Sequence, residues 1–293
     1  MTNSLDDFSD ILSLDENLAA HTWLKIGGKA ERFYTPTSRD QLVALVRCCV
    51  ANSVPVKVLG GGSNLLVADA GVSGAVIKLA DPLLNKVTVN GNIVAAEGGA
   101  LLSHVVSESV RANLAGLENL VGIPGTIGAA VAGNSGGRHG DIGEFVRSVE
   151  VMTHTGEVVE RRNDELTFAY RTSSITDLVV LSVTLELRPD ESNDLTTRMK
   201  KIWIMKRATQ PMADQSAGCI FRNPRGLSAG ALIEQCGLKD LSVGKARISD
   251  RHANFVVTEP GACSGEVQSL VDKVKAAVAE KFGVDLQLEI RQW

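Results

Sequence analysis

Apolar residues recur with two different periods along this chain, and the changes of period predict its helices and strands. A helix is expected after Ser38, which has a glutamine three residues later, as in a capping box. Its apolar face would carry Leu42, Leu45, Val46 and Cys49. The apolar run of residues 56–59 predicts a buried strand. Strict alternation over residues 181–187 predicts an antiparallel strand with one face in the core.

Turn signals place two hairpins and one break between these elements. Asn90-Gly91 separates two apolar segments and is a strong hairpin signal, and Thr155-Gly156 marks a second hairpin. The polar run of residues 188–194 predicts a domain boundary. Beyond it the pattern predicts helices over 195–207 and 229–237, a strand over 253–257, a helix capped by Ser264 and a last strand over 286–291.

We therefore expect a mixed α+β protein of two domains. Residues 1–20 form an N-terminal extension without a recognisable pattern, residues 21–193 form the first domain, and residues 194–293 form the second. A chain of 293 residues is long enough for two hydrophobic cores.

Composition excludes several classes of protein. The net charge of −4 and the absence of a Lys/Arg-rich block argue against a nucleic-acid partner. No apolar run approaches the ~20 residues of a membrane span, and the N-terminus lacks the features of a signal peptide. Five cysteines without a CxxC pair indicate reduced thiols in a cytoplasm. No clustered His/Cys motif is present, so we expect no metal.

A glycine-rich segment follows the strand predicted at 56–59. Its candidate ligand-binding residues are Gly60, Gly61, Gly62, Ser63, Asn64 and Leu65. Glycines let a backbone come close to a ligand, and successive amide N–H groups can cradle a phosphate. The segment is neither a Walker A loop nor a GxGxxG motif. Taken alone, it could be an ordinary turn.

A second glycine-rich segment supports a nucleotide site. Its candidate residues are Gly122, Ile123, Pro124, Gly125, Thr126, Gly128, Asn134 and Ser135. Thr126 can bond a phosphate oxygen or cap the next helix. Two phosphate-type loops in one domain suggest a dinucleotide held in extended form, although two unrelated surface loops remain the alternative.

An ordered set of motifs carries a family resemblance. The matching segments are residues 21–28, 60–66, 116–118, 122–128, 170–173, 217–224, 229–234, 252–255 and 286–289. With this set the chain resembles the flavin-dependent UDP-N-acetylenolpyruvoylglucosamine reductases, and the short spacing after Tyr170-Arg171 is similar to the type II members. The resemblance implies an FAD-binding domain of the vanillyl-alcohol-oxidase (PCMH) type. A smaller α+β substrate domain would follow, with a C-terminal strand that returns to the active site.

The resemblance also implies a reaction. NADPH would reduce FAD, and the reduced flavin would then reduce UDP-N-acetylglucosamine enolpyruvate to UDP-N-acetylmuramate, a precursor of peptidoglycan. The implied partner is this small molecule. We favour a monomer.

Three residues would carry the chemistry by this resemblance. Arg171 would bind the substrate carboxylate, since a guanidinium stays charged and can form two parallel hydrogen bonds to one carboxylate. Cys219 stands where the family usually has the serine that donates the proton, and a thiol can donate one too. Glu289 would act beside the enolpyruvyl group as an acid or an electrostatic partner. The alternatives are a surface arginine, a small buried cysteine and a solvated glutamate.

Four further residues would contact the substrate: Tyr170, Arg207, Gln210 and Asn223. Gln210 stands where several family members carry lysine. The alternative for residues 207–210 is a solvated helix end. Two other functions stay open as well: a different flavoprotein oxidoreductase on the same fold, and a catalytically silent nucleotide-binding protein with the Cys219 change as its sign.

Overall fold

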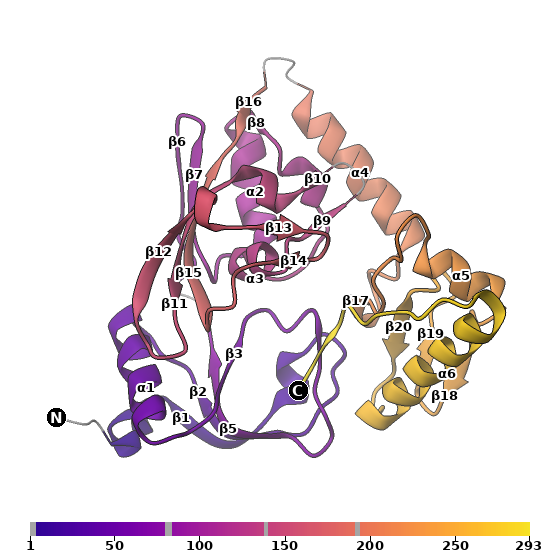
Figure 1. Ribbon diagram of the computed structural model, residues 1–293, viewed down its shortest axis with the longest axis horizontal. Helices are drawn as coiled ribbons and strands as arrows, with labels where there is room; N and C mark the ends of the chain where they lie inside the picture. The colour runs from indigo at the N-terminus through magenta and orange to yellow at the C-terminus, as the bar shows by residue number, and fades with distance from the viewer. Residues whose placement is uncertain (1–3, 80–83, 138–139, 191–193) are drawn as a thin grey trace. The chain divides into compact units, whose positions relative to one another are not determined.

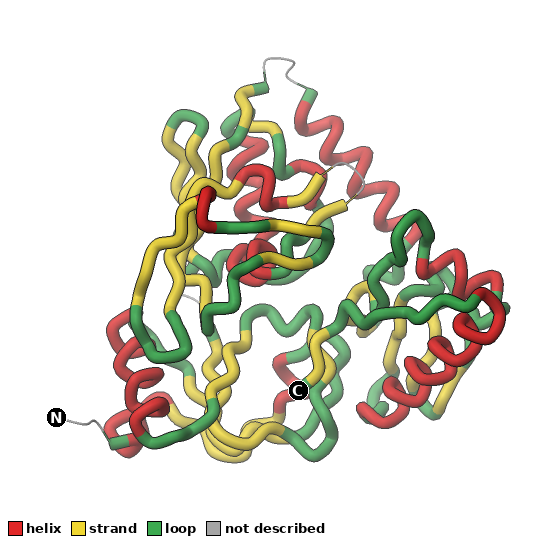
Figure 2. The backbone as a smooth tube through the Cα atoms, viewed as in Figure 1, coloured by secondary structure: helices red, strands yellow, loops and turns green. Residues whose placement is uncertain are grey.

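The chain folds into two compact units, shown as a computed structural model in Figure 1. The structure describes residues 4–79, 84–137, 140–190 and 194–293. The first unit comprises Met1–Leu14, Arg32–Gly61 and Ser73–Ile204, and the second comprises Asp15–Glu31, Gly62–Val72 and Met205–Trp293. Both units mix helices with strands, as Figure 2 shows, which confirms the α+β class.

The division into units differs from the continuous domains expected from the sequence. Asp15–Glu31 and Gly62–Val72 precede most of the first unit in sequence, yet they belong to the same compact unit as Met205–Trp293. Leu24 and Leu66 are buried in one apolar cluster with Phe221, which gives the physical reason. Of the polar run expected at the boundary, residues 191–193 lie outside the described residues.

The first unit is built on two sheets. An antiparallel sheet has the order β12-β11-β15-β7-β6, with β6 at Val87–Asn90, β7 at Ile93–Glu97, β11 at Val146–Met152, β12 at Val158–Arg162 and β15 at Val179–Glu186. A second sheet, whose strands β1 and β2 extend into segments of the second unit, has the order β1-β2-β5-β3, with β1 at Leu12–Asn17, β2 at Lys29–Tyr34, β3 at Val56–Leu59 and β5 at Val72–Lys78. β3 and β5 run parallel.

Helices and short strand pairs complete the first unit. The helices are α1 (Arg39–Ala51), α2 (Leu102–Arg111), α3 (Ile127–Ala132) and α4 (Leu195–Thr209), the last of which continues into the second unit. The short pairs are β8 (Leu114–Ala115) with β16 (Arg188–Pro189), β9 (Gly136–Gly137) with β10 (Gly140–Asp141), and β13 (Phe168–Ala169) with β14 (Thr172–Ser173). The 3₁₀ helices are Leu5–Ile11, Glu118–Leu120, Ile142–Phe145 and Asn163–Glu165.

Helix α1 shows why the sequence pattern predicted this part of the fold. Ser38 accepts a hydrogen bond from Gln41 N at 3.2 Å, and the Gln41 side chain accepts one from Thr37 N at 2.8 Å. The expected apolar face is buried together with Ile77 of β5 and Leu181 of β15. The predicted helix and strands are confirmed here.

The second unit combines an antiparallel sheet with two helices. The sheet order is β17-β20-β19-β18, with β17 at Gln215–Cys219, β18 at Ser242–Val243, β19 at Ala246–Ile248 and β20 at Phe255–Thr258. The other elements are a 3₁₀ helix at Leu18–His21, α5 (Ala229–Gln235), α6 (Ser264–Phe282), and β4 (Leu65–Leu66), which pairs in parallel with β21 (Arg291–Gln292). Val267, Leu270, Val271, Val274 and Val278 of α6 are buried, as its pattern predicted.

Three local predictions need correction. Ser264 is the first residue of α6 and Cys263 is the N-cap, while the backbone N–H groups of Ser264 and Gly265 donate to the Asp69 carboxylate at 2.8 and 3.3 Å. The last strand, predicted over residues 286–291, is reduced to β21. Residue 288 of the predicted strand makes only an isolated bridge to Phe221. The first hairpin turns at residues 91–92, since Asn90 itself pairs with Ile93.

Candidate functional site

The start of the first glycine segment packs against the second one within the first unit. A Cβ added to Gly60 would lie 3.2 Å from Thr126 Oγ1, and one added to Gly61 would lie 3.1 Å from Gly125 Cα. Gly125 has a φ of +104°, which favours glycine. The two segments are therefore neighbours, and side chains larger than hydrogen would push them apart.

Backbone donors at this junction are available to a ligand. Among the described residues, the N–H groups of Gly61, Gly125 and Thr126 donate to no protein acceptor. Thr126 is 6% exposed, and a buried backbone donor without a partner is rare in folded proteins, whereas Gly61 and Gly125 are half-buried. An anion in front of these amides would satisfy them, which is the chemistry that the sequence predicted for a phosphate-binding loop.

Other residues of the second segment have structural contacts. Thr126 caps α3 by accepting a hydrogen bond from Ala129 N at 3.5 Å. Gly128 lies inside α3, donates its N–H to Gly98 O at 3.0 Å, and has no room for a Cβ against that oxygen. Ile123 N donates to Leu120 O at 3.0 Å, whereas Pro124 is exposed.

The rest of the first glycine segment belongs to the second unit. Gly62 has a φ of +63°, and its added Cβ would lie 2.0 Å from His21 O. Its carbonyl accepts a hydrogen bond from Trp23 N at 3.0 Å. Ser63 is half-buried, Leu65 is buried in β4, and Asn64 is exposed. The motif at 21–23 thus supports the glycine turn directly.

Cys219 and Glu289 are brought together in the second unit. Glu289 N donates to Ile220 O at 2.8 Å, so the glutamate lies beside the residue that follows Cys219. The Asn64 side chain donates to Glu289 O at 3.1 Å. Cys219 and Glu289 are both half-buried. The residues that carry the thiol and the carboxylate are therefore linked through their backbones, together with one residue of the glycine segment.

Asn254 holds this neighbourhood and was given no role by the sequence reasoning. It is 3% exposed, accepts a hydrogen bond from Phe221 N at 3.0 Å, and donates its amide to Phe221 O at 2.8 Å. Its own carbonyl accepts from Ile220 N at 2.9 Å. The signal was present, because the matching segment 252–255 contains this asparagine.

Arg171 occupies a strained hairpin turn of the first unit. Tyr170 and Arg171 join β13 to β14, and Arg171 has a φ of +57°. Its guanidinium donates to Gly136 O at 2.8 Å, lies 3.5 Å from Asp141 Oδ1, and stands 5.1 Å from the centre of the Tyr170 ring. A non-glycine residue with positive φ is uncommon and often marks a functional position.

Asp141 is a second residue that the sequence reasoning missed. Burial raises the pKa of its carboxyl, the Arg171 guanidinium opposes that rise, and Glu144 adds to it. Gly136 leaves room for this carboxylate, since a Cβ there would lie 1.6 Å from Asp141 Oδ1. Asp141 and Arg171 thus form an ion pair that is already in place without a ligand.

Asn134 and Ser135 are placed by backbone contacts. Asn134 is 3% exposed, donates to Ala169 O at 2.8 Å and accepts from Gly143 N at 3.0 Å. These bonds hold the hairpin that carries Arg171, which is a structural use of a residue predicted to bind cofactor. Ser135 N donates to Ala130 O at 2.7 Å.

The remaining predicted substrate contacts lie at the surface of their elements. Tyr170 is 46% exposed. Arg207, at the end of α4, is exposed, and Gln210, just after it, is half-buried. Asn223 is exposed, and its side chain accepts from Ala229 N at the start of α5, at 2.9 Å. Their roles toward a substrate stay predictions.

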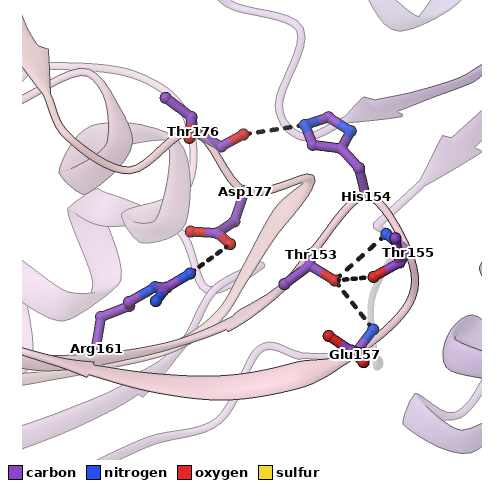
Figure 3. A network of polar contacts seen from close by, with 7 residues as sticks. All are labelled: Thr153, His154, Thr155, Glu157, Arg161, Thr176 and Asp177. Atoms are coloured by element: carbon purple, nitrogen blue, oxygen red, sulfur yellow. Dashed lines mark hydrogen bonds and ion pairs between the residues drawn. The ribbon is translucent and has the colours of Figure 1, made fainter.

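A separate hollow of about 270 Å³ in the first unit contains none of the predicted site residues. Arg161 lines it and pairs with Asp177 at 3.3 Å, while His154 contacts Thr176 O at 3.0 Å (Figure 3). Thr153 Oγ1 contacts the Thr155 hydroxyl at 2.8 Å and accepts from two backbone N–H groups of the same turn (Figure 3). This network ties a hairpin turn and a loop within the protein, so we assign it no ligand.

Two negative findings concern the described part of the chain. No group of three or more His, Cys, Asp or Glu side chains there could hold a metal ion. None of its helices combines the length and the apolar character that crossing a bilayer requires.

Two family models match parts of this chain. Residues 210–293 match the family model "UDP-N-acetylenolpyruvoylglucosamine reductase, C-terminal domain", and residues 30–162 match that of an FAD binding domain. These matches confirm the expected fold of a flavin-binding domain and a C-terminal substrate domain.

Two relatives and one solved structure align with nearly the full length of this chain. UDP-N-acetylenolpyruvoylglucosamine reductase of Clostridium botulinum is 37% identical over 99% of this chain and 96% of its own. The enzyme of that name from Heliobacterium modesticaldum is 39% identical over 99% and 93%. The crystal structure of the Thermus caldophilus reductase has a TM-score of 0.81 at 36% identity, covering 96% of this chain and 99% of the other. The chain therefore belongs to the UDP-N-acetylenolpyruvoylglucosamine reductase family of flavin-dependent oxidoreductases.

Proposed function

We propose that this protein catalyses the NADPH-dependent, FAD-mediated reduction of UDP-N-acetylglucosamine enolpyruvate to UDP-N-acetylmuramate. One observation carries the proposal: Asn64 of the glycine segment bonds Glu289, whose backbone bonds the residue next to Cys219. The second-unit end of the glycine segment is thus tied by hydrogen bonds to the backbone that carries the two candidate proton donors. We place the reaction in the cytoplasm, as a step of peptidoglycan synthesis that serves cell-wall growth, cell shape and division.

The residues present fit FAD at the junction of the glycine segments. The N–H groups of Gly61, Gly125 and Thr126 have no acceptor among the described residues, and the close packing at Gly60 and Gly61 brings the donors of both segments together, where a diphosphate would accept from them. When bound, FAD supplies the hydride transfer between NADPH and the enolpyruvyl carbon.

Arg171 would bind the carboxylate of the enolpyruvyl group. Addition of hydride to an enol ether moves negative charge toward that carboxylate, and a fixed cation stabilises it. The contacts to Gly136 O and Asp141 support this role, because they hold the guanidinium before substrate binds. A side chain that is already ordered loses little conformational freedom on binding.

Cys219 and Glu289 would manage the proton. The thiol would give its proton to the carbon next to the one that receives hydride. Glu289 would act nearby as an acid or through its charge. Their neighbouring backbones support a joint role, since Glu289 N is bonded to Ile220 O.

The test is an anaerobic stopped-flow experiment that follows the visible absorption of oxidised flavin. NADPH should bleach the holoenzyme, and UDP-N-acetylglucosamine enolpyruvate should restore the band with formation of UDP-N-acetylmuramate. Flavin that is reduced but does not reoxidise with this substrate would overturn the proposal. Reoxidation by oxygen or by an alcohol-derived carbonyl alone would favour another flavoprotein oxidoreductase. Flavin that NADPH cannot bleach would favour a silent nucleotide-binding protein.

A further inference from the structure

A lysine lies directly behind the first glycine segment, and neither its charge nor its contact enters the function described above. Lys78 ends β5 and pairs in register with Leu59 of β3, the last residue before the glycines. Its Nζ donates to Gly60 O at 2.6 Å. β3 and β5 thus fix both the loop and the cation that contacts it.

The charge of Lys78 has no carboxylate partner among the described residues, because no ion pair includes it there. Burial lowers the pKa of its ammonium group. A cation taken partly out of water without a counterion is costly, and an anion nearby would offset that cost. The position therefore makes physical sense if the loop receives an anionic ligand.

The contact also acts on the donor that faces such a ligand. Gly60 O and the N–H of Gly61 belong to the same planar peptide unit and point in opposite directions. An ammonium bonded to the oxygen polarises the unit and strengthens the N–H on its other side, because hydrogen bonds in a chain reinforce one another. That N–H has no acceptor among the described residues.

We propose that Lys78 is a positioning residue for the FAD diphosphate, acting through the Gly60–Gly61 peptide to hold the loop and to add positive potential at its amides. This inference rests on the proposed function, since it takes the loop to bind the cofactor. It concerns cofactor affinity and assigns Lys78 no part in hydride or proton transfer.

The test measures FAD binding by apoprotein, using flavin fluorescence at several salt concentrations. Lys78→Gln keeps a hydrogen-bond donor and removes the charge, so it should raise the Kd about tenfold or more at low salt. Its Kd should also depend less on salt than that of the wild type, because salt screens charges. Lys78→Arg should restore most of the affinity and of the salt dependence. Lys86→Gln, which neutralises an exposed lysine of the same unit, should match the wild type.

Each outcome decides one question. A Lys78→Gln protein with wild-type Kd and salt dependence would overturn the inference. Uniformly weaker binding with an unchanged salt dependence would overturn the electrostatic part of the inference, because Lys78 would then only hold the loop in place. Urea unfolding of each apoprotein shows whether a variant folds, and where Lys78→Gln does not fold, Lys78→Met takes its place as the uncharged variant. Wild-type apoprotein that binds no FAD would contradict the proposed function, a result distinct from those above.

Discussion

Cys219 follows a distortion of its own strand. The pairing of β17 with β20 shifts between Ser216 and Cys219, and Gly218 has a φ of +78°. Such a bulge redirects the side chains of a strand and is common beside functional sites. The backbone therefore sets the direction of the thiol, and the chemical identity of the group can be changed without rebuilding the strand.

Replacement of this thiol separates proton donation from the other steps. Cys219→Ala removes the donor, so flavin reoxidation by the enolpyruvyl substrate should slow about 10²–10⁴-fold, the usual contribution of a general acid. Reduction by NADPH should stay at the wild-type rate. Cys219→Ser should keep most of the reoxidation rate, since serine also carries a proton. Single-turnover stopped flow measures both half-reactions. If the alanine variant reoxidises as fast as the wild type, Cys219 has no part in the mechanism.

Residues that act through their own side chain were easier to predict from the sequence than residues that hold others. Cys219 was found through its motif, and the structure bonds Glu289 N to the carbonyl of the next residue, Ile220. Asp141 and Lys78 were missed, because each matters through a contact with a residue distant in sequence. Asn254 lies in a matched segment, but its bonds to Phe221 could not be read from the motif. A pattern of residue types does not report such contacts.

At the level of helices and strands, local patterns predicted most elements and failed where distant segments complete them. Helix α1 has its own cap in Ser38, whereas α6 adds to its local Cys263–Glu266 capping box an acceptor from Asp69, nearly two hundred positions earlier. Burial would raise the pKa of the Asp69 carboxyl, but hydrogen bonds from residues 263–265 outweigh it and lower the pKa. Its lowered pKa means that the ionised carboxylate stabilises the fold.

The contribution of Asp69 should depend on pH in a definite direction. Asp69→Ala should lower the free energy of unfolding by about 1 kcal/mol at neutral pH, as loss of a helix cap does. A lowered folded pKa gives stability that is complete above the unfolded value of ~3.9 and is lost as the pH falls below it. Urea unfolding at pH 7, 5 and 3.5 should show equal losses at the first two values and a smaller one at the third. Asp214→Ala, an exposed aspartate of the same unit, is the control. A loss that grows with acidity would refute the capping role.

Two glycines of the second unit should respond oppositely to the same substitution. Gly28 precedes β2, and its added Cβ would lie 2.3 Å from Asp69 O and 2.4 Å from Gly71 N. Backbone atoms cannot move aside as a flexible side chain can, so Gly28→Ala should lower the free energy of unfolding by about 3 kcal/mol or more. Gly265 lies in α6, and a Cβ added there would have its nearest contact at 3.9 Å. Gly265→Ala should therefore leave the free energy of unfolding unchanged or raise it by up to ~1 kcal/mol. Thermal and urea unfolding of both variants decide the matter, and equal effects would contradict the packing argument.

Considered as a whole chain, the molecule interleaves its two units in sequence. The polar run at 188–194 suggested that the second domain begins there, yet that unit also needs Asp15–Glu31 and Gly62–Val72. The Thr258 hydroxyl donates to Leu24 O at 2.6 Å, and β21 pairs with β4. Sequence patterns find breaks between segments, but they do not reveal which segments share a core.

This interleaving predicts that Met205–Trp293 does not fold when expressed alone. The fragment lacks Leu24, Ile26 and Leu66, which are 0%, 3% and 4% exposed in the core of the unit. Loss of one large buried side chain typically costs about 2–5 kcal/mol, so losing three exceeds much of the ~5–15 kcal/mol that stabilises a domain. The fragment should show poorly dispersed amide NMR signals and no cooperative urea transition, whereas the full chain shows both dispersion and cooperativity. A fragment that unfolds cooperatively would mean that its residues suffice for a core, and that the two early segments only attach to a unit that folds without them.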